Sequence, residues 1–315
     1  MPLNARIFRG ISLPISLILL FFTMLIFPAP VLTGASKGLL LWFNTVLPTL
    51  FPFILICNLM LSTKAIDLLL ALTRPVFCRL FGVSPYGSFA VLAGFLCGYP
   101  MGAKVTADLY RQEKIEKTEA AYLLSFCNNT SPMFILSFLV MQNLKDDRLK
   151  LPTLAILFLS PVIISFGCRP FSKKSTGTYR NISSQPSYAS LSDALDFSIG
   201  NALESITKVG VYIMIFAILT ELAGLFPFSG SFPGFILLSC LEVTNGITMF
   251  CQSGIDRDIT YILCLFITSF GGLCAAAQTA SMIKGTGIPM YDYLIKKLAT
   301  ALVASLLAAL YLYLF

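Results

Sequence analysis

The feature that most constrains this chain is the recurrence of apolar runs long enough to cross a lipid bilayer. The hydrocarbon core of a bilayer is about 30 Å thick, which an α-helix of about 20 residues spans. Such runs occupy residues 11–30, 37–61, 119–141, 151–168, 201–225, 259–283 and 291–314. Only 12% of the 315 residues are charged, whereas soluble domains are about a quarter charged. The sequence therefore predicts an all-α polytopic membrane protein in which residues 1–315 form a single transmembrane domain.

Two further apolar stretches, 85–108 and 232–254, are interrupted by glycine and proline. Each is predicted to be a re-entrant helical hairpin, which enters the membrane and returns to the same side. The basic residues agree with this topology. If the N-terminus is cytoplasmic, most Lys and Arg residues, with Lys296 and Lys297 among them, fall on the cytoplasmic side, as the positive-inside rule requires. Residues 11–30 are expected to be an uncleaved anchor rather than a signal peptide.

The same assignment exposes two internal repeats. Repeat one covers 37–141 with its hairpin at 85–108, and repeat two covers 201–283 with its hairpin at 232–254. Because their first spans cross the membrane in opposite directions, the repeats are predicted to be inverted. Residues 169–198 between them are predicted to be a cytoplasmic linker. Inverted repeats are the plan of many secondary transporters, which bind substrate near the membrane midplane.

The last span of each repeat is predicted to be broken at its centre. In repeat one the polar segment 127–132 ends in Pro132, and proline removes a backbone donor from a helix. In repeat two the adjacent Gly271 and Gly272 weaken the helix. Unwound backbone at membrane depth is tolerated only against protein or a water-filled cavity. We therefore expect each break to lie against protein or beside a water-filled cavity.

The residue types exclude several classes of protein. There is no His, and none of the nine Cys forms a CxxC pair, so a zinc site, a His-based triad and a disulfide framework are not expected. The net charge of +7 is spread between the apolar runs. It therefore marks membrane orientation rather than binding to nucleic acid. Without a convincing nucleophile–base pair, we expect no enzyme activity and no cofactor.

The turn of the first hairpin is the sharpest local signal of a site. A half-helix that begins near Met101 would point its positive end toward an anion. Lys104 lies one turn further on. An ammonium inside a bilayer is energetically costly, so it usually binds a ligand or has a partner. The alternative is an ion pair with Asp108, four residues away on the same face. The substrate-binding residues predicted here are Gly98, Tyr99, Pro100, Met101, Gly102 and Lys104.

A polar cluster lies at the predicted break of the first repeat. Amides and hydroxyls supply both hydrogen-bond donors and acceptors, and the cluster faces the glycine-rich hairpin in the predicted arrangement. The alternative is that these side chains join helices through interhelical hydrogen bonds. The cluster, predicted to line the substrate site, consists of Asn128, Asn129, Thr130 and Ser131.

The turn of the second hairpin contains Glu242, the strongest candidate for a coupling residue. A carboxyl in a partly dry cavity can carry a proton, and with Thr244 and Asn245 it could instead bind Na⁺ through oxygen atoms. The alternative is a carboxyl that caps a half-helix. Gln278, beyond the predicted second break, would complete this shell. Thr244, Asn245 and Gln278 are therefore predicted to bind substrate.

The segments GFLCGYPMGAK, FCNNTSPMF, LEVTNG and SFGGLCAAAQ together resemble the sporulation integral membrane proteins of the YlbJ (SpoVV) family. That resemblance extends over roughly 37–314. It implies a nucleoside-recognition (Gate) domain, similar to that of concentrative nucleoside transporters. It also implies an endospore-forming bacterium, residence in the outer forespore membrane, and passage of dipicolinate from the mother cell toward the spore.

Three functions remain open at this point. The first is a carrier for a small organic anion, which is dipicolinate by resemblance and is supported by Lys104. The second is a nucleoside carrier coupled to Na⁺ or protons through Glu242. The third is a membrane protein of spore assembly that transports nothing. The expected partners are a small-molecule substrate and the lipid bilayer, and homo-oligomerisation is left open.

Overall fold

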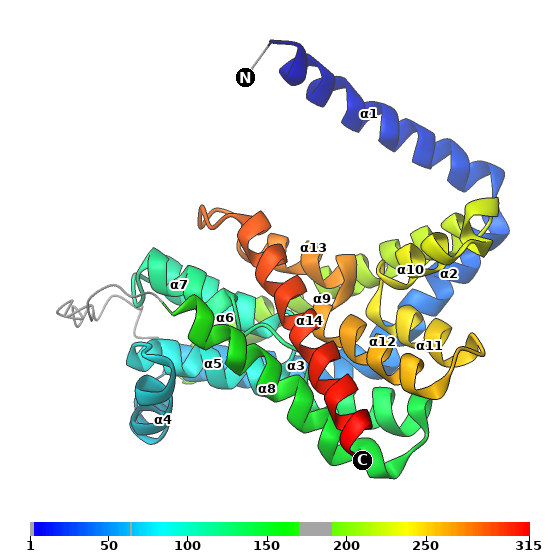
Figure 1. Cartoon of the computed structure of the whole chain (residues 1–315). Helices are drawn as coiled ribbons and strands as arrows, with labels where there is room; N and C mark the ends of the chain where they lie inside the picture. Colours follow the sequence, from blue (N-terminus) through cyan, green and yellow to red (C-terminus); the bar gives the residue numbers. More distant parts are fainter. Residues whose placement is uncertain (1–2, 64, 170–190) are drawn as a thin grey trace.

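The structure is a computed structural model that describes residues 3–63, 65–169 and 191–315. Every regular element in these ranges is a helix (Figure 1), so the predicted all-α class is confirmed. Within the described residues, five helices are long and apolar enough to cross a membrane: Pro28–Ser62, Asp147–Cys168, Leu191–Gly224, Arg257–Met282 and Met290–Leu314.

The chain begins with two helical segments that meet near Phe27. Helix α1 (Leu3–Ile26) extends away from the rest of the molecule in Figure 1. The next helix runs without interruption through α2 (Pro28–Leu41), the π-helical segment η1 (Trp42–Val46) and α3 (Leu47–Ser62). It starts at Pro28 because proline is favoured in a first helical turn, where its missing N–H is not needed. The predicted span 37–61 therefore begins nine residues too late, and the predicted span 11–30 is divided between two helices.

The first predicted hairpin is present as a pair of packed helices. Helix α4 (Ala65–Phe81) bends by 92° into α5 (Pro85–Cys97), and α5 packs against α6 (Met101–Arg111). The Ser84 hydroxyl caps α5 by accepting a hydrogen bond from the Gly87 N–H at 3.0 Å. Between α5 and α6 the chain turns at Gly98, whose φ of 86° favours glycine, and at a cis Tyr99–Pro100 peptide bond.

The first predicted break is also present. Helix α7 (Lys117–Leu124) ends, and the chain from 128 to 131 has no helical structure before the π-helical segment η2 (Phe134–Leu144). The short η3 (Asp147–Leu149) then leads into α8 (Lys150–Cys168).

The second half of the chain repeats this order of elements. It consists of α9 (Leu191–Ala223), η4 (Pro227–Gly230), the hairpin α10 (Phe232–Ser239) and α11 (Val243–Gln252), the helix α12 (Arg257–Phe270) and α13 (Gly272–Met282), and α14 (Met290–Leu314). The break between α12 and α13 falls at Gly271, whose φ is 85°. Residues 191–198 of the predicted linker 169–198 are helical and form the first turns of α9. Residues 170–190 of that linker lie outside the described part of the chain.

Contacts between the two halves are reciprocal. The hairpin helix α6 contacts α13, the second part of the broken helix in the other half, and α11 contacts η2 in the corresponding way. The long helices α2 and α3 pack against α9, and α8 packs against α14. The order of elements and these contacts agree with two repeats, whereas their inverted orientation in a membrane stays a prediction.

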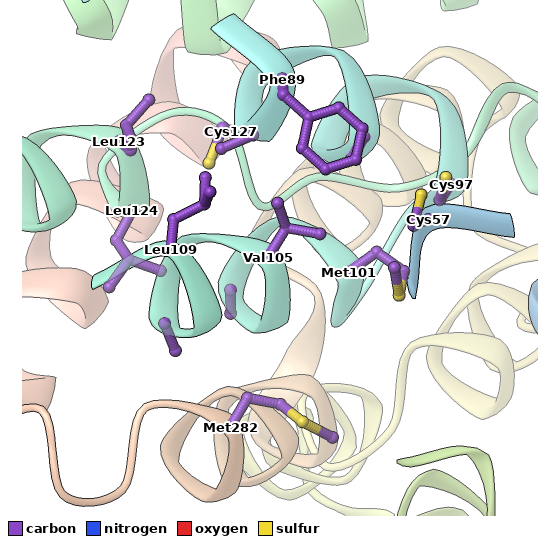
Figure 2. Close-up of a cluster of buried hydrophobic side chains, with 14 of the residues drawn as sticks. Cys57, Phe89, Cys97, Met101, Val105, Leu109, Leu123, Leu124, Cys127 and Met282 are labelled. Carbon is purple, nitrogen blue, oxygen red and sulfur yellow. The ribbon is translucent and has the colours of Figure 1, made fainter. Parts of the chain in front are cut away.

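Two clusters of buried apolar side chains hold the halves together. The first surrounds α6, where Val105 and Leu109 lie among Phe89 of α5 and Leu123 and Leu124 of α7 (Figure 2). The second joins η2, α8, α11, α12 and the C-terminal part of α14. Large apolar side chains on the outer faces of several helices are exposed, as expected for surfaces that face lipid.

Candidate functional site

A cavity of about 110 Å³ lies where the two hairpin turns meet the two helix breaks. A single water needs about 10–15 Å³ of such space, so the cavity has room for several waters or a small solute. Both hairpin turns, both broken helices, α9 and the helix that passes through η1 form its wall. The lining residues are Leu41, Thr45, Val46, Thr49, Leu50, Cys97, Gly98, Tyr99, Thr130, Ser131, Phe134, Ser137, Val209, Ile213, Glu242, Val243, Thr244, Gly271, Cys274, Ala275 and Gln278.

The wall divides into a polar part and an apolar part. Hydroxyls, one carboxyl and one amide come from the hairpin turns and the broken helices, while the long helices contribute mostly aliphatic side chains such as Val209 and Ile213. The π-helical segments η1 and η2 both reach the cavity, with Thr45 and Phe134. Such segments are frequent at functional sites. A few polar groups in a largely apolar wall are typical of small-molecule sites.

The turn of the first hairpin is tied to the breaks in both halves. The Tyr99 hydroxyl donates a hydrogen bond to the Ser269 carbonyl at 2.9 Å, beside the second break. The Thr130 hydroxyl, in the first break, donates to the Thr268 carbonyl at 2.8 Å. Gly98 lies so close to Ser131 that an added Cβ would be 2.8 Å from the Ser131 nitrogen. These contacts place the two breaks side by side at one wall of the cavity.

The N-terminal ends of both second hairpin helices already have internal partners. At α6, the Ala103 N–H donates to the Asn128 side-chain oxygen at 3.2 Å. At α11, the Glu242 carboxyl accepts from the Thr244 N–H at 3.1 Å and the Asn245 N–H at 3.0 Å, and from the Thr244 hydroxyl. Glu242 thus has the geometry of the helix cap weighed above. It also lines the cavity.

Lys104 does not line the cavity. Its ammonium is 2.7 Å from the Asp108 carboxylate and donates to the Asn58 side-chain oxygen at 3.3 Å. Only 5% of the residue is exposed. The Asp108 carboxylate also forms an ion pair with the Arg111 guanidinium at 3.0 Å. This is the ion pair that the sequence left as the alternative to substrate binding.

The two asparagines of the first break point away from the cavity. The Asn128 amide donates to the Thr279 hydroxyl at 2.9 Å and to the Tyr293 hydroxyl at 3.0 Å. The Asn129 amide donates to the Phe126 carbonyl at 2.6 Å. The contacts of Asn128 with α13 and α14 fit the alternative in which these residues join helices, whereas this bond of Asn129 is local.

The predicted site residues therefore fall into two groups. The structure brings together at the cavity Gly98, Tyr99, Thr130, Ser131, Glu242, Thr244 and Gln278. It places behind this wall Pro100, Met101, Gly102, Lys104, Asn128, Asn129 and Asn245. The second group includes backbone packing positions, because a Cβ at Gly102 would overlap the Cys127 carbonyl.

Lys297 is the functional candidate that the sequence analysis missed. The charge pattern predicts that it lies on the cytoplasmic side with Lys296, but it is 2% exposed inside α14. Its ammonium donates to the Asn128 carbonyl at 2.9 Å and to the Asn129 side-chain oxygen at 3.1 Å, and lies 4.9 Å from the centre of the Tyr99 ring. The signal was a charged residue within a long apolar run. Its position next to Lys296 concealed it.

Other polar positions have simpler explanations. Glu204 and Lys208 form an ion pair at 2.5 Å on the exposed face of α9, outside the cavity wall. Lys37 pairs with Glu221 at 2.7 Å.

Thr45 and Thr49 line the cavity although the sequence did not mark them as site residues. They are four residues apart within an apolar run, and both face the cavity.

The chain has a counterpart among characterised proteins. It is 23% identical to the sporulation integral membrane protein YlbJ of Bacillus subtilis (strain 168), over 91% of this chain and 79% of that protein. The chain is thus similar to YlbJ over most of its length. The similarity supports the YlbJ family that the motifs predicted, and together with the apolar helices it identifies an integral membrane protein.

Two other comparisons found no counterpart. No protein-family model matches the chain, and no solved structure matches it. The Gate domain and the similarity to concentrative nucleoside transporters stay predictions of the sequence motifs.

Proposed function

We propose that this relative of YlbJ is a membrane transporter for a small organic solute that acts during sporulation. The observation that carries the proposal is the cavity, which is lined by two hairpin turns and two helix breaks from both halves of the chain. Broken helices around a central site are the arrangement by which secondary transporters hold solutes within the membrane. The sporulation role follows the relative, whose name describes a sporulation integral membrane protein.

Dipicolinate is our first candidate for the solute, moved from the mother cell across the outer forespore membrane. It is a flat aromatic ring with two carboxylates. The Ser131 hydroxyl accepts a hydrogen bond from the Phe134 N–H and keeps its own proton to donate. Gln278 has a second amide proton beside the one given to Cys274. Phe134, Val209 and Ile213 offer an apolar wall for a ring.

A neutral polar solute such as a nucleoside is the second candidate. The observation that favours it is the charge of the wall, since Glu242 reaches the cavity while Lys104 is held by Asp108 behind it. A carboxylate accepts hydrogen bonds from sugar hydroxyls but repels another carboxylate. If Glu242 carries a proton, that repulsion is removed, so the effect of neutralising Glu242 separates the two candidates.

The test is uptake of labelled dipicolinate and uridine into proteoliposomes that contain the purified full chain. We expect dipicolinate uptake, a roughly ten-fold or larger loss in Gln278→Ala, and retained uptake in Glu242→Gln. Lys208→Ala is the control, because the Lys208 side chain is exposed, pairs with Glu204 and does not line the cavity. Uridine uptake without dipicolinate uptake would replace the first candidate by the second. If neither solute is taken up and cavity variants still support spore formation, the non-transport alternative is favoured.

A further inference from the structure

Lys297 is a buried ammonium with an unusual set of neighbours. Among the described residues, no ion pair joins it to an acidic side chain, in contrast to Lys104 with Asp108 and Lys296 with Asp292. Its partners are two oxygen atoms of the first helix break and the face of the Tyr99 ring. Neutral oxygen atoms and a ring face compensate only part of the hydration that a buried ammonium loses.

Lys297 links α14 to two elements that form the cavity wall. It comes from α14, its hydrogen bonds go to the first break at 128–129, and the Tyr99 ring beneath it belongs to the first hairpin turn. Tyr99 lines the cavity and also bonds to Ser269 in the second half. A change at Lys297 would therefore act on the wall through Tyr99 and through the break.

We propose that Lys297 is a proton-binding latch of the cavity. In its charged form the ammonium holds the hairpin turn and the first break together. When it gives its proton to water, the neutral amine loses the attraction of the ring and can donate only weaker hydrogen bonds, so the two segments separate. No covalent bond changes other than the N–H bond, and the proton returns when the amine is exposed to the other side.

The groups around Lys297 support this assignment. The titratable side chains beside it are Tyr99 of the hairpin turn and Cys127 of the first break, and Tyr293 of its own helix contacts the same Asn128. Thiols and phenols carry no charge at neutral pH by their ordinary pKa values. Lys296 and Asp292 form their own pair at 2.6 Å. Within the described part of the chain, the charge at this position therefore belongs to Lys297 alone, and a proton there changes the local net charge from zero to one.

A first experiment tests the latch without any solute. Amide hydrogen exchange of segments 98–104 and 125–132 is measured over a range of pH in the detergent-purified chain, corrected for the intrinsic exchange rate. We expect protection to fall as the pH rises in the unmodified protein. Lys297→Arg, which stays charged, should keep its protection at every pH, and Lys297→Met should exchange about ten-fold faster or more at every pH, because charge-assisted hydrogen bonds are lost.

Two variants make this experiment decisive. Lys296→Met changes the adjacent lysine, which is outside the latch, and should leave the exchange profile unaltered. Asn129→Ala removes one acceptor of the ammonium, so release should occur at a lower pH even if the Lys297 variants do not fold. Identical pH profiles for the unmodified protein and all folded variants of Lys297 and Asn129 would overturn the proposal.

The second experiment tests coupling, which rests on the proposed transport function. Solute uptake into proteoliposomes is measured with and without an imposed pH gradient. The gradient should change the uptake rate of the unmodified protein and of Lys296→Met several-fold, and should have no effect in Lys297→Arg. An uptake rate of the unmodified protein that is the same with and without the pH gradient would refute coupling through Lys297. Absence of uptake in every variant would count against the proposed function, and hydrogen exchange alone would then decide the latch.

Discussion

Gly94 shows how closely single residues of the first hairpin approach the first helix break. A Cβ built at Gly94 would overlap the carbonyl oxygen of Cys127, which is backbone and cannot move aside as a flexible side chain would. We therefore expect Gly94→Ala to lower the free energy of unfolding by about 1–3 kcal/mol, the usual cost of overpacking. The measurement is the melting temperature of the purified protein in detergent.

Gly200→Ala is the matched control for that substitution. Gly200 also lies in a helix, but nothing would come within 4 Å of its Cβ. Alanine restricts the unfolded chain more than glycine does, so Gly200→Ala should leave stability unchanged or raise it by up to about 1 kcal/mol. Equal destabilisation by both substitutions would mean that Gly94 is not a packing position.

Lys104 provides a second prediction for a single side chain. Because its ammonium is held by Asp108 and lies outside the cavity wall, Lys104→Met should lower stability by about 1.5–3 kcal/mol, the range for a hydrogen bond to a charged group. Adding Asp108→Asn should restore part of the loss, because it removes the partly buried carboxylate that has lost Lys104 and keeps only Arg111. Chemical denaturation of the single and double variants measures this coupling. A purely additive double variant would contradict the pair.

The sequence predicted which residues were polar inside the membrane, but not always which way they point. Tyr99, Thr130 and Glu242 reach the cavity as predicted, whereas Asn128 and Lys104 do not. Neighbouring residues in an unwound segment point in different directions, and their directions depend on contacts with distant helices such as α13 and α14. Those contacts are not visible in a local pattern.

At the scale of elements, an ion pair between Asp146 and Arg257 connects the loop before α8 to the start of α12. Asp146 accepts from Arg257 at 2.9 Å and from the Arg148 guanidinium at 3.1 Å. The hydrogen bonds from Arg148, helped by the charge of Arg257, hold the pKa of the Asp146 carboxyl below its usual range. A carboxyl with a lowered folded-state pKa stabilises the fold above its unfolded pKa of about 3.9, and this contribution is lost as the pH falls through the folded value.

The melting temperature should therefore decrease as the pH falls below about 5, partly because the unfolded chain takes up a proton at Asp146 before the folded protein does. Asp146→Asn should reduce this decrease and should lower stability at neutral pH. Asp147→Asn is the control, because Asp147 is mostly exposed and pairs with Lys150 in its own segment. An acid-induced decrease of the same size in Asp146→Asn and in the unmodified protein would contradict the prediction.

Hairpins and helix breaks could be predicted because glycine and proline interrupt apolar runs at those places. Gly98, Pro132 and Gly271 mark them in the sequence and in the structure alike. The starts of α2 and α9 could not be predicted in the same way. The first turns of α9 carry Ser192, Asp193 and Asp196, so they look like a polar linker, although Ala194 and Ser198 on the other face are buried.

At the scale of the whole molecule, the two halves depend on each other for the cavity. Each hairpin packs against the broken helix of the other half through the contacts of α6 with α13 and of α11 with η2. Hydrogen bonds from Tyr99 and Thr130 to the second break join the halves at the cavity wall. A movement of one half relative to the other would therefore change the wall on both sides, which is the change that alternating access requires.

The inverted orientation of the halves is the prediction for the whole molecule. In Figure 1 the hairpin α5–α6 and the hairpin α10–α11 lie at opposite ends of the molecule, with α14 between them. If both hairpins are re-entrant, the loops at 112–116 and 253–256 must open on opposite faces of the membrane. Glu116→Cys and Gln252→Cys, both exposed positions, are placed singly in a chain whose nine native Cys are replaced.

Each variant is then labelled with a membrane-impermeant maleimide in intact cells and in inverted vesicles. The labelling pattern shows on which face of the membrane each cysteine lies. Glu116→Cys should react only in inverted vesicles and Gln252→Cys only in intact cells, because the positive-inside rule places the first loop in the cytoplasm. Permeabilised cells, where both positions must react, provide the control for exposure. Reaction of both positions from one face would exclude inverted repeats, even though the order of helices, hairpins and breaks recurs in the two halves.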